Sequence, residues 1–144
     1  MHRKDPRNPL MAEDLLVGEQ LTQDMITAGE HVLEALDKTG VQVKVAFWLL
    51  LAEQHTWRLV MASPEVRTLG PREVYRKVAA VIKRLPPSAQ SIGIKDITVL
   101  EDTHEMVLLM RSFTRTGPTI SKIRMSRNVV NGQLIEDALL YRVT

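Results

Sequence analysis

The stretch VQVKVAFWLLLAEQHTWRLVMAS, residues 41–63, decides the fold because two apolar runs flank a short polar segment. The first run alternates with a period of two before it becomes continuously apolar, and the second resembles it in composition, which is typical of paired strands. A turn at the polar EQHT segment would place Trp48 opposite Leu59 and Leu50 opposite Trp57. The stretch therefore predicts an antiparallel hairpin that is apolar on both faces.

Helical patterns lie on both sides of this hairpin. Residues 12–39 carry apolar side chains at spacings of three and four, which predicts one helix or a helix pair divided at Gly18. Residues 71–85 repeat this spacing after a proline in the first position. Residues 1–9 are polar and contain two prolines, so we expect a disordered lead before a single domain of residues 10–144.

The remaining chain predicts two more hairpins. Their expected strands are residues 94–100, 105–113, 119–130 and 133–143. Asn131-Gly132 is the strongest turn signal, since this pair favours a two-residue type I′ loop. The order is a helix or helix pair, then strand, strand, helix and four strands. It predicts an α+β fold with one mainly antiparallel sheet of about six strands.

Three of these strands are apolar on both faces, which a sheet covered by helices on one side does not require. The apolar runs fall in residues 45–51, 106–110 and 138–141. Either the helices divide between the two faces, or a second copy of the chain covers one of them. We therefore expect a homo-oligomer, a dimer or a larger closed assembly.

Charge is unevenly distributed along the chain. Residues 1–57 hold 5 basic and 9 acidic residues, a net charge of −4, whereas residues 58–144 hold 14 and 8, a net charge of +6. Such a division fits an anionic partner, and it fits equally well an acidic segment lying over a basic one within the molecule or on a second copy.

The last hairpin concentrates part of this positive charge. Counting back from the Asn131-Gly132 turn places Lys122 and Arg124 on one face together with Tyr141, and Arg111 or Arg115 would lie near them if the preceding strand is the neighbour. We predict these residues as a partner-binding surface for nucleic acid or an acidic protein. A solvated strand whose cationic stems cover apolar surface explains the same pattern.

The segment EDTHE, residues 101–105, is the densest cluster of carboxylates with a histidine. Such a cluster could hold a metal or supply a general acid and base, but neighbouring strand residues point to opposite faces and metal ligands must converge. A polar turn explains it more simply. We therefore predict no catalytic residues, no bound metal and no cofactor.

Composition limits the remaining classes of function. The chain of 144 residues has no cysteine, which excludes disulfides and thiolate chemistry. The longest apolar run is far shorter than the roughly 20 residues of a membrane span, and the start of the sequence lacks the apolar segment of a signal peptide, so we expect a cytoplasmic protein without a membrane partner. Motifs for phosphate loops, dinucleotide binding, zinc proteases and nucleophile elbows are absent.

These observations favour a small, non-enzymatic binding or adaptor module that associates with itself and binds an anionic partner through its basic C-terminal hairpin. The alternative is a small hydrolase or metal-dependent enzyme with a site near residues 101–105 or in the loop of residues 63–71.

Overall fold

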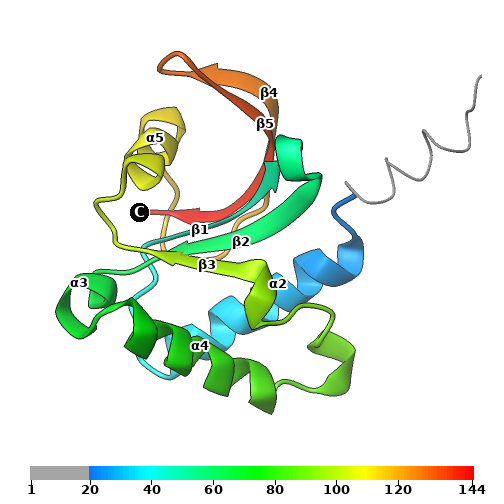
Figure 1. Cartoon of the computed structure of the whole chain (residues 1–144), viewed down its shortest axis with the longest axis vertical. Coiled ribbons are helices and arrows are strands. Elements are labelled where there is room, and N and C mark those ends of the chain that lie inside the picture. The colour runs from blue at the N-terminus through cyan, green and yellow to red at the C-terminus, as the bar shows by residue number, and fades with distance from the viewer. Residues whose placement is uncertain (1–19) are drawn as a thin grey trace, which may run out of the picture.

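The computed structural model describes residues 20–144 and shows an α+β fold with one five-stranded sheet (Figure 1). The strands are β1 (Val45–Leu51), β2 (Thr56–Ala62), β3 (Ile97–Leu100), β4 (Ile123–Val130) and β5 (Gln133–Val143). Their order across the sheet is β3-β2-β1-β5-β4. Only the β2 and β3 pair is parallel, so the sheet is mainly antiparallel as predicted, with five strands instead of about six. The predicted lead of residues 1–9 and the possible break at Gly18 lie outside the described residues.

Helices cover both faces of the sheet. They are α2 (Gln23–Lys38), α3 (Glu65–Leu69), α4 (Pro71–Arg84) and α5 (Glu105–Phe113), with short 3₁₀ turns η1 (Ala52–Gln54), η2 (Pro87–Ala89) and η3 (Ile94–Asp96). Figure 1 shows α2 and α4 on one face, and α5 on the other, where the β4–β5 hairpin curls over. None of the helices within residues 20–144 has the length and apolarity needed to cross a bilayer.

The first hairpin has the predicted register, with Trp48 opposite Leu59 and Leu50 opposite Trp57. Because successive strand residues point to opposite faces, β1 contributes to two separate apolar cores. Trp48 packs in the core beneath α2 and α4, and Phe47 packs in the core beneath α5. The apolar character of both faces is therefore used within one chain.

The prediction of a strand at residues 105–113 is wrong, because this segment forms helix α5. Glu, Met, Leu and Arg dominate it and are good helix formers, with one β-branched residue, Val107. His104 caps the helix, since its Nδ1 accepts a hydrogen bond from Met106 N at 3.0 Å. The predicted strand before it is shorter than expected, because residues 94–96 form η3. With α5 in place, β3 pairs in parallel with β2.

The last hairpin has the predicted turn and register. Asn131 and Gly132 both have positive φ, 51° and 80°, and Val130 lies opposite Gln133. Ladder pairing continues from there to Ile123 opposite Leu140, with one irregularity at Arg127, whose φ is 53°. The strand β4 begins at Ile123, so residues 119–122 of the predicted strand lie outside it.

Candidate functional site

The five residues predicted to bind a partner do not form one surface. Arg111 lies on α5, where its Nε donates to Thr144 O at 2.9 Å and its Nη1 donates to Asp102 O at 2.9 Å. Lys122 lies on the chain entering β4, and its Nζ is 2.9 Å from Glu30 Oε1 on α2. Since α2 and α5 cover opposite faces of the sheet, these two cations are separated. The misplacement of Arg111 follows directly from the helical state of α5.

Arg124 is neutralised within the hairpin. Its Nε and Nη2 each donate to a carboxylate oxygen of Asp137 at 2.7 Å, and its guanidinium lies 5.5 Å from the centroid of the Trp57 ring. Partial burial raises the pKa of Asp137, but the hydrogen bonds from Arg124 and Ser126 outweigh burial and lower this pKa below its ordinary value. Arg115 is exposed in the connection before β4.

The expected surface position of Tyr141 is wrong, because this residue is buried against α2 and α4. Tyr141 is 0% exposed. Its hydroxyl accepts a hydrogen bond from Trp48 Nε1 at 2.9 Å and donates one to Ile26 O at 2.6 Å. Burial raises the pKa of this phenol strongly. Tyr141 therefore joins β5, β1 and α2, and no partner reaches it in this fold.

The segment of residues 101–105 and the loop of residues 63–71 have structural roles. Asp102 pairs with Arg67 of α3, which ties the two segments together. Ser63 is buried, and its Oγ accepts a hydrogen bond from Glu65 N at 3.1 Å. Within residues 20–144, no group of three histidine, aspartate or glutamate side chains is placed to hold a metal ion.

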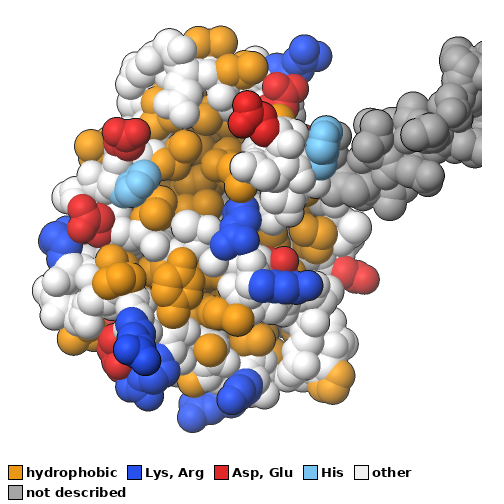
Figure 2. All heavy atoms as spheres, viewed as in Figure 1, with side chains coloured by type: hydrophobic (Ala, Val, Ile, Leu, Met, Phe, Trp, Pro, Cys, Tyr) orange, Lys and Arg blue, Asp and Glu red, His pale blue; other side chains and the backbone are white. Residues whose placement is uncertain are grey.

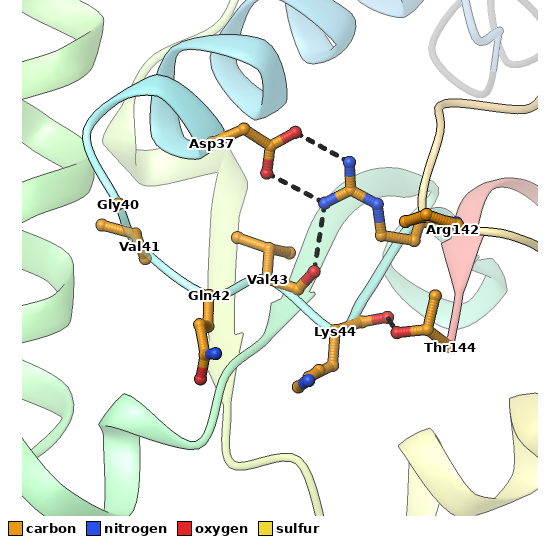
Figure 3. A pocket seen from close by; sticks show the side chains of 9 residues that line it. Asp37, Gly40, Val41, Gln42, Val43, Lys44, Arg142 and Thr144 are labelled. Carbon is orange, nitrogen blue, oxygen red and sulfur yellow. Dashed lines mark hydrogen bonds and ion pairs between the residues drawn. The ribbon is translucent and has the colours of Figure 1, made fainter.

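A pocket of about 380 Å³ lies where the end of α2 meets the ends of β1 and β5 (Figure 3). At its wall, Arg142 is only 6% exposed, and its guanidinium donates to both carboxylate oxygens of Asp37 at 3.0 and 2.7 Å and to Val43 O at 3.1 Å. The β1–β5 ladder shifts register between Ala46 and Phe47, a bulge that leaves Tyr141 without a partner in the ladder. The pocket combines this compensated ion pair with Lys44, which forms no ion pair with any residue that the structure describes.

A larger recess lies on the α5 side of the sheet. Two hollows, of about 330 and about 430 Å³, share Met106 and Gln133 and together form what we call the apolar groove. It runs from the start of α5, past the tip of the β4–β5 hairpin, to the end of β1 and η1. Figure 2 shows it as a hollow with a hydrophobic floor between α5 and the hairpin. The apolar side chains that line it are Leu49, Leu50, Leu51, Ala52, Met106, Leu108, Leu109, Leu134 and Ile135.

Two of these side chains are unusually exposed. Leu108 is 52% exposed on α5, and Leu134 is 55% exposed near the hairpin tip. Val129, the cross-strand neighbour of Leu134, is 69% exposed. Large aliphatic side chains that gather around a hollow mark a binding surface more often than single exposed leucines do.

The rim of the apolar groove is acidic. Its charged members are Glu53 of η1, Glu105 of α5 and Glu136 of β5, and no lysine or arginine of residues 20–144 lines it. Glu53 and Glu105 are exposed and form no ion pair with any residue in the described part of the chain. Glu136 is partly exposed, and its Oε1 lies 3.9 Å from Arg127 Nε, a long ion pair. This groove is not evident in the sequence, because its walls come from four elements, β1, η1, α5 and β5.

The chain matches no protein-family model, no curated protein and no solved structure. The geometry of these surfaces is therefore the basis for a functional proposal.

Proposed function

We propose that this protein is a protein-interaction module whose apolar groove holds a segment of a partner that combines apolar side chains with lysine or arginine. The observation that carries the proposal is the combination of an apolar floor with an acidic rim. Burial of exposed leucines supplies affinity, and the rim selects a segment with positive charge.

The groove has the size and lining of a peptide-binding surface. A partner side chain seated there would bury Leu108 and Leu134, both about half exposed in the free protein. Full burial of a leucine contributes roughly 1.5 to 3 kcal/mol, so the part still exposed on each contributes about 1 kcal/mol. Two such contacts contribute about 2 kcal/mol, and apolar side chains of the partner supply the rest of the roughly 8 kcal/mol that micromolar binding requires beyond the cost of association.

Charge complementarity favours a basic partner over a second copy of this chain. In a two-fold dimer the same surface meets itself, so the acidic rim of one groove would face the acidic rim of the other. Moreover α5 covers the sheet face for which a second subunit was expected, which removes the original reason for predicting a homo-oligomer. Self-association stays a prediction. Binding of a basic segment in the groove is tested separately, with peptides.

The test uses two helical peptides of roughly 14 residues, about four turns, that share the same leucines and alanines and differ only in carrying lysine or glutamate. Calorimetric titration is expected to show binding of the lysine peptide at least about tenfold tighter than of the glutamate peptide. Leu108→Ser and Leu134→Ser should each weaken binding roughly fivefold, which corresponds to about 1 kcal/mol.

Leu69→Ser is the matched control, because Leu69 is 49% exposed on α3 and does not line the groove. The proposal is wrong if neither peptide binds, or if the control weakens binding as much as the groove variants do. Light scattering after size exclusion tests whether a second copy of this chain occupies the groove instead. A dimer that Leu108→Ser and Leu134→Ser dissociate would show that the groove holds a second copy.

A further inference from the structure

The exposed side of α4 carries a row of cations. Arg72, Arg76 and Lys83 are exposed and lie within about 40° of one another around the helix axis, at about 100° per residue, and the exposed Arg84 lies about 120° from Arg72. Lys83 is exposed beside Arg84. We call these four residues the basic ridge. Twelve residues separate its ends, a rise of about 18 Å at 1.5 Å per residue. Figure 2 shows Lys and Arg side chains along the lower edge of the molecule, below the sheet where Figure 1 places α4.

The positive charge of the basic ridge is largely uncompensated. Glu73 is the only acidic residue of α4, and it pairs with Arg76, whose Nε donates to Glu73 Oε1 at 3.1 Å. Arg72, Lys83 and Arg84 form no ion pair with any residue among those the structure describes. The predicted hairpin cations differ, because Lys122 pairs with Glu30 and Arg124 with Asp137.

Helix stability explains only part of this arrangement. Lys83 and Arg84 lie in the last turn of α4, where the helix dipole favours positive charge. Arg72 lies in the first turn, where the dipole disfavours positive charge. Its presence there extends the row at a small cost to the helix, as expected for a residue that serves binding.

We propose that the basic ridge binds the phosphate backbone of a duplex nucleic acid. Arginine matches phosphate with two parallel hydrogen bonds, and three of the four ridge cations are arginines. One strand of a duplex rises 3.4 Å per nucleotide, so an 18 Å row spans about five nucleotides and reaches three or four phosphates.

The composition of the ridge separates this partner from others. Within residues 72–84 the exposed side chains are the four ridge cations and Ala80, so no aromatic or large aliphatic side chain is exposed there. Protein interfaces centre on aromatic and aliphatic anchors, peripheral membrane helices insert such anchors, and single-strand binders stack bases on aromatic rings. A regular array of phosphates needs none of these. Contacts to the backbone alone make the binding independent of base sequence.

The basic ridge and the apolar groove lie on opposite sides of the sheet. Helix α4 packs on the core that contains Trp48, whereas α5 packs on the core that contains Phe47. The two surfaces can therefore be occupied at the same time. Binding of a duplex to the ridge does not depend on binding of a peptide in the groove. A negative result in one of the two experiments therefore leaves the other proposal unaffected.

The test measures fluorescence anisotropy of a labelled DNA duplex of roughly 20 base pairs, about 68 Å long at 3.4 Å per base pair, over a series of salt concentrations. The full chain is expected to bind at low salt, with log K falling against log salt with a slope of about −3 to −4. Arg72→Glu with Arg84→Glu should lower the affinity by more than about tenfold and reduce the slope by about two. Arg72→Gln with Arg84→Gln should reduce the slope by a similar amount without introducing acidic charge.

Lys122→Glu with Arg124→Glu is the matched control, because it changes the net charge by the same amount at the hairpin predicted earlier. Retained binding in this control, with loss in the ridge variants, supports the proposal. The proposal is overturned if the duplex does not bind at low salt, if the hairpin variant loses as much affinity as the ridge variant, or if anionic lipid vesicles bind and the duplex does not.

Discussion

Replacement of Gly29 by alanine is expected to destabilise the protein, although alanine is the better helix former. Gly29 lies within α2, where the helix passes over the buried pair of Trp48 and Tyr141. An alanine Cβ at this position would lie 2.5 Å from Tyr141 Oη and 2.9 Å from Trp48 Nε1. Both distances are shorter than a carbon atom tolerates, and both neighbours belong to rigid rings held by hydrogen bonds.

The magnitude follows from two opposing effects. Overpacking of a core costs about 3 kcal/mol at the upper end of its usual range, and the gain in helix propensity from glycine to alanine is about 1 kcal/mol. The net loss in the free energy of unfolding is therefore about 2 kcal/mol. At about 3 °C per kcal/mol for a chain of this size, the melting temperature should fall by about 6 °C.

A double-mutant cycle with Tyr141→Phe isolates the contact. Tyr141→Phe alone leaves Trp48 Nε1 and Ile26 O without their partner and should cost about 2 kcal/mol. In that background the atom at 2.5 Å is gone, and the next contacts of a Cβ at position 29 are at 2.9 and 3.1 Å. The two changes together should cost about 2.5 kcal/mol instead of about 4, a coupling of about 1.5 kcal/mol.

The assay is urea unfolding followed by tryptophan fluorescence, since both Trp48 and Trp57 are buried and become exposed on unfolding. Unchanged m-values are required, so that midpoints report stability. A rise in the midpoint for Gly29→Ala would show that helix propensity prevails and that α2 does not lie this close to the ring pair. Additive costs in the cycle would refute the contact itself.

Two further predictions concern helix starts and acid stability. His104→Ala should lower stability by about 1 kcal/mol, because the imidazole caps α5, and His104→Asp should retain it; an unchanged melting temperature in the alanine variant would contradict the cap. The pKa of Glu65 lies below its ordinary value, chiefly because Gln42 N donates to its carboxylate and with a further contribution from Lys77, while burial opposes the shift. A carboxylate with a lowered pKa stabilises the fold above the unfolded value and loses this effect as pH falls through the folded value. Glu65→Gln should therefore lose less stability than the native chain between about pH 5 and about pH 3. The assignment is contradicted if the melting temperatures of the two proteins fall by the same amount over that range.

The elements that could be predicted from the sequence are those with local determinants. The hairpin β1–β2 and the register of β4–β5 follow from a period of two and from the Asn131-Gly132 turn, which do not depend on distant parts of the chain. Helix α5 could not be told from a strand, because a short apolar run fits both and its cap is a histidine, which is not among the preferred N-cap residues. Because of that one error, Arg111 was predicted to lie beside the last hairpin, whereas it lies on α5.

The surfaces differ in how far the sequence determines them. Burial of Tyr141 depends on α2 lying over β5, which no local pattern specifies. The apolar groove is built from α5, β5, β1 and η1, so it is visible only in three dimensions. The basic ridge was accessible from the start, since Arg72, Arg76 and Lys83 have helical spacing within a predicted helix. The prediction of that helix rests on its apolar spacing, which assigns no role to its charged side.

The apolar groove exists because two neighbouring strands differ in length. β5 has 11 residues and β1 has 7, and their ladder ends where Leu49 meets Ala138. Residues 133–137 therefore extend beyond the ladder with β1 and are paired with β4 on their other side. A hairpin that projects in this way cannot close against β1, so Leu134 near its tip and Leu108 on α5 remain about half exposed. The Asn131-Gly132 turn fixes the length of the projection, and thereby the position of the acidic Glu136, which lines the groove together with Glu53. The same local signal that makes the hairpin predictable thus creates the surface that the sequence alone did not disclose.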